Sequence, residues 1–145
     1  MITFKPDLNI FDSESVCIVN PVNLEGVMGK GLALEFKKRF PNNFINYKKA
    51  CKSKELIFGE LYFFNENEKL ICNFPTKTVW REQSNLILID IGLEKLKNKI
   101  ISFNIQSVTI PKLGCGLGGL EWTTVRELIL NRLKNVYCDI IIIGD

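Results

Sequence analysis

Apolar runs bounded by glycine, proline or asparagine alternate along this chain with segments whose apolar residues recur at helical spacing. The apolar runs predict strands that begin at residues 15, 107 and 138, and residues 1–4 are expected to form an edge strand. Residues 56–64 and 69–74 are expected to pair as a hairpin across the polar turn 65–68. Apolar residues three or four apart predict helices at 32–40, 43–52, 85–101 and 122–134. This alternation predicts an α/β protein, with one sheet between layers of helices.

Three loops that follow predicted strands carry residues suited to ligand binding. The first begins with Asn20-Pro-Val-Asn23, where Pro21 is expected to stop sheet pairing, and continues into the glycine-rich turn 26–31. The second, 75–81, carries a lysine, an arginine and a tryptophan, and the third has four glycines within 114–119. Ligands of open α/β sheets bind outside the carboxyl ends of the strands, so these loops are expected to form one composite site.

The four glycines at 114, 116, 118 and 119 predict an anion cradle, with phosphate as the expected ligand. Without a Cβ, their backbone N–H groups can approach a ligand closely, and the helix that opens at Trp122 is expected to add its positive dipole end. An ordinary strand-to-helix turn needs one glycine or two. A second glycine-rich turn at 26–31 suggests a diphosphate held from both sides.

Other glycine-loop and cysteine motifs fit poorly. Residues 26–31 lack the Gly-Lys-Ser/Thr ending of a P-loop. A cysteine phosphatase would carry an arginine six residues after its catalytic cysteine, but Glu121 stands at that distance from Cys115. Glycines 114, 116 and 119 match the dinucleotide-binding fingerprint, but the match begins too near the C-terminal end for a second nucleotide-binding half to follow. Redox chemistry with a dinucleotide is therefore not expected.

The composition narrows the chemistry further. The 145 residues have the length of a single domain, a net charge of +3 permits an anionic ligand, and a cytoplasmic location is expected because no membrane span or signal peptide is recognised. Five cysteines without CxxC spacing indicate reduced thiols in or near the core. The absence of histidine excludes Ser-His-Asp and Cys-His catalysis and the common histidine-containing zinc sites. No metal or cofactor is predicted, and an enzyme would use Lys, Asp, Glu, Tyr, Cys or bound water.

Segments 20–23, 26–37, 73–81 and 111–122 resemble those of macrodomains, and more narrowly those of the branch that holds the DarG antitoxin macrodomain and the terminal ADP-ribose glycohydrolase. The resemblance covers nearly the whole chain. It implies a three-layer α/β/α fold with a central mixed sheet flanked by helices, with residues 1–145 as a single macrodomain. It also implies ADP-ribose binding.

The resemblance implies a role for each matching position. The backbone at Asn9 and Ile10 meets the adenine end, Asn23 reaches the distal ribose, and Lys77 acts at the anomeric carbon of that ribose. Lys77 either attacks this carbon through its amine or assists departure of the linked group. A lysine amine is nucleophilic only when deprotonated, which desolvation favours. The remaining expected ADP-ribose ligands are Asn20, Gly26, Val27, Met28, Gly29, Lys30, Gly31, Thr76, Leu113, Gly114, Cys115, Gly116, Leu117, Gly118, Gly119 and Leu120.

One departure within the branch favours a DNA substrate. The glycohydrolase that acts on acidic protein side chains carries an aspartate where this chain has Gly118, whereas the DarG form removes ADP-ribose from thymidine in DNA. Trp80 could stack on a base and Arg81 could hold a backbone phosphate, or both could simply pack and solvate their loop. The resemblance also implies a DarT-type toxin as partner. DarG proteins carry a second domain that blocks the toxin, and because the 145 residues end after the last predicted strand, that function is expected either to be absent or to lie outside them.

The sequence thus predicts an ADP-ribosyl hydrolase that acts on ADP-ribosylated thymidine in single-stranded DNA through Lys77 and Asn23. Two alternatives stay open. One is a module that binds ADP-ribose or ADP-ribosylated targets without turnover. The other is hydrolysis of another linkage, either a carboxylate ester on protein or the phosphate of ADP-ribose 1″-phosphate.

Overall fold

A single six-stranded mixed sheet forms the centre of the computed structural model, which describes all 145 residues. The strands lie in the order β1-β6-β5-β2-β4-β3, and only β3 runs antiparallel to its neighbour, β4. The prediction of one mixed sheet is therefore confirmed. The strand bounds are β1 Ile2–Phe4, β2 Cys17–Val22, β3 Tyr62–Glu66, β4 Lys69–Pro75, β5 Ser107–Ile110 and β6 Asp139–Ile142.

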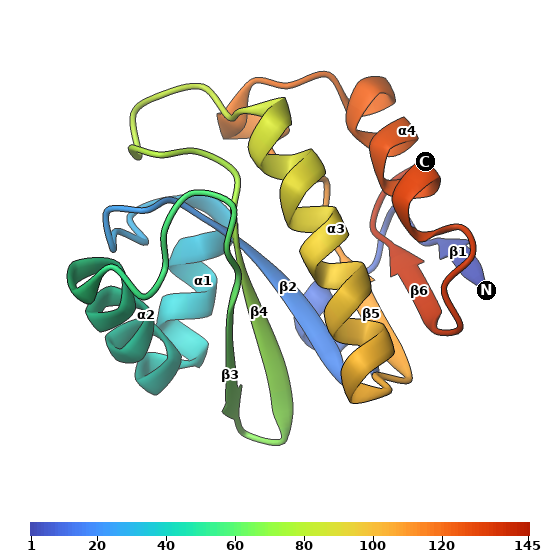
Figure 1. The fold of residues 1–145 in the computed structure, drawn as a ribbon, viewed down its shortest axis with the longest axis horizontal. Helices are drawn as coiled ribbons and strands as arrows, with labels where there is room; N and C mark the ends of the chain where they lie inside the picture. The colour runs from blue at the N-terminus through green and yellow to red at the C-terminus, as the bar shows by residue number, and fades with distance from the viewer.

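Four α-helices cover the two faces of this sheet (Figure 1). Helices α1 (Gly31–Arg39) and α2 (Pro41–Ser53) pack on one face, and α3 (Leu86–Phe103) and α4 (Trp122–Leu133) pack on the other. The three-layer α/β/α prediction is confirmed, and the predicted helices begin and end within two residues of the observed ones. None of these helices combines the length and apolar character that crossing a bilayer requires.

Alternation along β2 divides the core between the two faces. Cys17 and Val19 belong to the large cluster under α3 and α4, whereas Ile18 and Val22 face α1 and α2. Neighbouring residues of a strand point to opposite faces, so this strand, buried on both sides, reads as a continuous apolar run. Its carboxyl end delivers the chain to the ligand-binding edge of the sheet.

Pro21 does not end strand β2, contrary to the prediction. The strand continues to Val22, and Pro21 lies in register with Phe74 of β4. The carbonyl of Val22 faces the β4 side and accepts a hydrogen bond from the N–H of Thr76 (2.9 Å), so the proline nitrogen faces the β5 side. Because β5 pairs only with the first two residues of β2, proline costs the sheet no ladder hydrogen bond there.

The predicted strand 56–64 is also shorter than expected. Strand β3 begins at Tyr62, and Leu56 instead caps the end of α2 by donating its N–H to the Ala50 carbonyl (3.0 Å). A turn follows, in which Gly59 has a φ of +86° that favours glycine. The apolar residues 56–58 therefore belong to a connection, although their pattern resembles that of a strand.

Candidate active site

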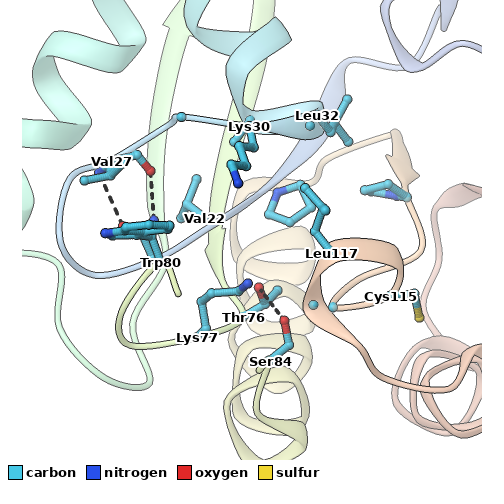
Figure 2. A pocket seen from close by; sticks show the side chains of 18 of the residues that line it. Val22, Val27, Lys30, Leu32, Thr76, Lys77, Trp80, Ser84, Cys115 and Leu117 are labelled. Atoms are coloured by element: carbon cyan, nitrogen blue, oxygen red, sulfur yellow. Dashed lines mark hydrogen bonds between the residues drawn. The ribbon is translucent and has the colours of Figure 1, made fainter. Parts of the chain in front are cut away.

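Three loops converge on a cavity of about 460 Å³ at the carboxyl ends of β2, β4 and β5. We call residues 23–30 the first loop, 76–85 the middle loop and 113–120 the glycine loop. The predicted composite site is thus present as a geometric feature (Figure 2). Its lining consists of Pro21, Val22, Asn23, Val27, Gly29, Lys30, Gly31, Leu32, Ala33, Thr76, Lys77, Trp80, Arg81, Ser84, Pro111, Lys112, Gly114, Cys115, Leu117 and Gly118.

The first loop is organised around the buried side chain of Asn23. Its Oδ1 accepts hydrogen bonds from the N–H groups of Glu25 (3.0 Å) and Val27 (3.3 Å), and its Nδ2 donates to the Val27 carbonyl (2.8 Å). Tyr47 of α2 donates its hydroxyl to both the carbonyl (2.8 Å) and the Oδ1 (2.9 Å) of Asn23. Asn23 therefore fixes the loop and retains one Nδ2 hydrogen for a ligand.

The helix end that faces the cavity is that of α1. Gly31, Leu32 and Ala33 line the cavity, and the residue before them, Lys30, makes no side-chain capping hydrogen bond. The first N–H groups of α1 are therefore free for an anion. The sequence suggested that the helix beginning at Trp122 would supply this positive end, but α4 contributes nothing to the cavity lining.

The glycine loop lies opposite the first loop. Its backbone turns at Gly114, Gly116 and Gly119, whose φ angles of +71°, +65° and +78° favour glycine, and a short 3-10 helix spans Gly116–Gly118. Leu117 at its tip is 71% exposed and approaches Gly31 across the cavity. The loop thus forms a second wall with little side-chain bulk, as an anion cradle requires.

The middle loop forms the remaining wall and carries Lys77. Thr76 is buried below it and is held by backbone hydrogen bonds to Val22 (2.9 Å) and Asn85 (2.7 Å). In Figure 2 the amines of Lys77 and Lys30 point toward the same space from the middle and first loops. Lys77 is half-buried and takes part in none of the ion pairs of the structure.

The charge of the cavity is positive throughout. Lys30, Lys77, Arg81 and Lys112 line it, and no carboxylate does. Of these four cations only Lys112 is paired, at 3.6 Å from Asp145. Unpaired cations around backbone N–H groups attract an anionic ligand and provide no group that would repel it.

Ser84 is a cavity residue that no sequence motif predicted. It is buried, donates its N–H to the Gly118 carbonyl (2.8 Å), and its Oγ lies 3.5 Å from the Thr76 hydroxyl. A Cβ added at Gly118 would collide with the Ser84 Oγ and lie 3.0 Å from its Cβ. Position 118 therefore has no room for an aspartate unless Ser84 moves, and a hydroxyl occupies that part of the cavity.

Several other cavity residues were missed, and some expected ones lie elsewhere. The cavity lining also includes Pro21, Val22, Leu32, Ala33, Pro111 and Lys112, and Tyr47 supports the lining from α2 by bonding Asn23. None of these was predicted as a ligand-binding residue, because their roles depend on contacts between distant segments. Asn20 is fully buried and donates to Asn73 Oδ1 (3.2 Å), and its own Oδ1 has no partner. Asn9 caps the 3-10 helix Ile10–Asp12. The expected ligands outside the lining are Asn9, Ile10, Asn20, Gly26, Met28, Leu113, Gly116, Gly119 and Leu120.

Fold and cavity together define a class, namely α/β proteins that present a cationic, glycine-rich cavity at the carboxyl edge of a mixed sheet. The family model of the Macro domain matches residues 19–129, and the chain belongs to the Macro domain family.

A Mycobacterium tuberculosis protein named DNA ADP-ribosyl glycohydrolase is 43% identical over 141 residues, which cover 94% of this chain and 40% of that protein. The chain thus spans less than half the length of this relative. Among solved structures, the macrodomain of Mycobacterium tuberculosis DarG matches with a TM-score of 0.93 at 40% identity, covering 98% of this chain and 96% of that chain. Thermosipho africanus DarTG in complex with ADP-ribose matches with a TM-score of 0.85 at 34% identity, covering 92% and 39%.

Proposed function

We propose that this chain, acting as a single macrodomain over residues 1–145, binds ADP-ribose in its cationic cavity and releases it from ADP-ribosylated thymidine in DNA. The observation that carries the proposal is the position of Lys77, an unpaired lysine between two glycine-rich loops in a cavity without carboxylates. The names of the similar proteins, a DNA ADP-ribosyl glycohydrolase and a DarTG bound to ADP-ribose, support the choice of ligand and reaction.

The diphosphate is assigned to the N-terminus of α1 and the glycine loop. The first N–H groups of α1 are free at the cavity, and Lys30 adds a positive charge at its rim. In the glycine loop the N–H groups of Gly114 and Leu117, which line the cavity, take part in no backbone hydrogen bond, whereas those of residues 115 and 118–120 donate to backbone carbonyls of residues 112–116.

The distal ribose is assigned to the end lined by Asn23 and Lys77, where the spare Nδ2 hydrogen of Asn23 can donate to a ribose hydroxyl. In the bound substrate the thymidine would extend out of the cavity beside Arg81 and Trp80, a residue that is 47% exposed.

The reaction breaks the bond between the anomeric carbon of the distal ribose and the thymidine. Water supplies a hydroxyl to that carbon and a proton to the departing thymidine. Lys77 either attacks the carbon through its amine, forming a C–N bond that water then hydrolyses, or donates a proton to the departing group. Since no histidine or carboxylate lines the cavity, Lys77 is the strongest candidate for either role.

The decisive experiment measures release of ADP-ribose from a single-stranded oligonucleotide ADP-ribosylated on thymidine. We expect Lys77→Ala to lower the rate by about 100-fold or more. Lys77→Arg keeps the positive charge without an amine nucleophile and separates charge stabilisation from attack. Lys134→Ala is the control, because Lys134 is an exposed lysine that lies outside the cavity lining and forms no ion pair, and it should keep the native activity.

Two outcomes would contradict the proposal. Release at the native rate by Lys77→Ala would remove the lysine from the mechanism. If the native chain binds ADP-ribose, as measured by calorimetry, but leaves the DNA modified, the chain is a binding module. ADP-ribosyl carboxylate esters and ADP-ribose 1″-phosphate would then be the next substrates to test.

The biological setting follows from the same proposal. Within this proposal we assign the protein to the cytoplasm. A DarT-type toxin is its proposed functional counterpart, because the similar Thermosipho africanus structure is named DarTG. Under this proposal neither a metal nor a redox cofactor takes part.

A further inference from the structure

The positive charge of the chain is concentrated in one region. Residues 30–55 contain eight of the 19 lysine and arginine residues but only two of the 16 acidic residues, which gives this region a net charge of +6. The rest of the chain has a net charge of −3. The mild overall charge of +3 therefore hides a strongly basic segment that comprises α1, α2 and the end of the first loop.

Four of these cations lie together at the end of α2. We call Lys48, Lys49, Lys52 and Lys54 the lysine surface; the first three lie in the last two turns of the helix, and Lys54 is its C-cap. All four are exposed, and none takes part in an ion pair. Lys48 and Lys52 are four residues apart and so share one side of the helix.

The lysine surface adjoins the first loop through Lys48, and this loop forms the end of the cavity where the distal ribose is assigned. The hydroxyl of Tyr47 bonds Asn23, which lines that end, and Lys48 is the next residue along α2. The stem of Lys48 also lies under the first loop, since a Cβ added at Gly26 would be 3.2 Å from the Lys48 Cγ. In Figure 1 the loop between β2 and α1 lies above α2, in agreement with these contacts. A chain leaving the cavity from this end passes close to the lysine surface.

We propose that the lysine surface binds the phosphate backbone of the single-stranded DNA that flanks the ADP-ribosylated thymidine. The inference rests on the proposed function, because only a DNA substrate extends beyond the cavity as a line of phosphates. Single-stranded DNA is held by basic tracks that follow its backbone, and each contact releases counterions. Lysines at the C-terminal end of a helix also stabilise its dipole. That role alone would leave DNA affinity unchanged when they are replaced.

The test compares Lys48→Glu/Lys52→Glu with the native chain on two substrates. One is a single-stranded oligonucleotide ADP-ribosylated on thymidine, and the other is the ADP-ribosylated thymidine nucleoside, which has no flanking phosphates. We expect KM for the oligonucleotide to rise by about tenfold. The slope of log KM against log salt concentration should fall by at least about 1.4, because two lysine contacts to phosphate are lost. The value of kcat and all kinetics with the nucleoside should stay unchanged.

The matched control is Lys5→Glu/Lys134→Glu, which changes the net charge equally at two exposed lysines that form no ion pair and lie outside residues 30–55. It should leave the KM for the oligonucleotide within about twofold of the native value. An equal rise in KM with both double variants would show a general charge effect and overturn the lysine surface.

Binding of an unmodified fluorescent oligonucleotide, followed by anisotropy, separates this inference from the proposed function. If the native chain binds the oligonucleotide and Lys48→Glu/Lys52→Glu does not, the lysine surface stands even when no ADP-ribose is released. If both bind it equally, or neither binds it, the lysine surface is overturned even when hydrolysis is normal. Unchanged affinity for free ADP-ribose would confirm that the double variant is folded.

Discussion

The hydrogen bonds that hold the first loop come mainly from side chains, whereas those within the glycine loop come from its own backbone. In the first loop, the side chain of Asn23 forms hydrogen bonds with the backbone of Glu25 and Val27. Tyr47 anchors Asn23 to α2, and Met28 is buried against the same helix.

In the glycine loop, successive backbone hydrogen bonds run from the Cys115 N–H to the Lys112 carbonyl (3.1 Å) through to the Leu120 N–H. Hydrogen bonds from other segments reach this loop from Gln83 and Ser84 of the middle loop.

This difference implies different mobilities for the two walls of the cavity. Opening the first loop would leave buried polar groups of Asn23 and Tyr47 without partners, which costs about 1–3 kcal/mol for each such group. Opening residues 114–119 of the glycine loop, which lie between Leu113 in the core and Leu120 packed against it, exposes mainly backbone groups that water can satisfy. We therefore expect the first loop to be preformed and the glycine loop to adjust around the ligand.

The largest effect is expected from filling the space beneath the glycine loop. In Gly114→Ala the new Cβ would lie 2.8 Å from Ile89 and Leu120 side-chain carbons, at a φ of +71°. Left-handed strain and overpacking together should lower the free energy of unfolding by about 3 kcal/mol. Gly116→Ala is the matched control, because its φ is +65° and no atom lies within 4 Å of the added Cβ. It should cost only about 1 kcal/mol.

Urea unfolding measures both values. Equal losses in the two variants would show that the backbone angle alone governs the glycine loop, and that the packing under Gly114 adds nothing.

A smaller effect is expected from releasing the first loop. Tyr47→Phe removes the hydroxyl that donates to Asn23 and should cost about 1–2 kcal/mol of unfolding free energy, because Tyr47 is fully buried. ADP-ribose affinity, measured by calorimetry, should fall several-fold as the first loop loses its anchor. Tyr137→Phe removes a hydroxyl from a side chain that is 93% exposed and should change neither quantity. Unchanged affinity in Tyr47→Phe would show that the anchor is not needed for binding.

The elements of this fold could be predicted because their local signals agree with their tertiary environment. Leu93 and Leu96, for example, recur at helical spacing in α3 and are fully buried, and Asn85 before them caps the helix. The convergence of three loops also followed from local rules, since each loop comes directly after a strand of one sheet.

The remaining features depend on pairings between distant segments. Pro21 was expected to end its strand because a sequence does not show which side of a strand is left unpaired. Ser84 and Tyr47 reach the cavity or its walls through contacts with Gly118 and Asn23, 34 and 24 residues away in the chain. Such contacts leave no periodic pattern, so the residues that support a site are the hardest to predict.

The smallest effect tests the difference in mobility without changing the protein. Burial raises the pKa of both Cys115, in the glycine loop, and Cys51, beneath the first loop, so both thiols are less ionised at neutral pH than free cysteine. Alkylation by iodoacetamide, which needs the thiolate, should be slow at neutral pH and still accelerate above pH 9. Mass spectrometry should find Cys115 modified about tenfold faster than Cys51, because Cys115 is only half-buried and lies in the adjustable loop, whereas Cys51 is buried beneath the fixed one. ADP-ribose should slow the reaction of Cys115, which lines the cavity. Equal rates at the two thiols would mean that both walls open together, and the proposed division between a fixed and an adjustable loop would be wrong.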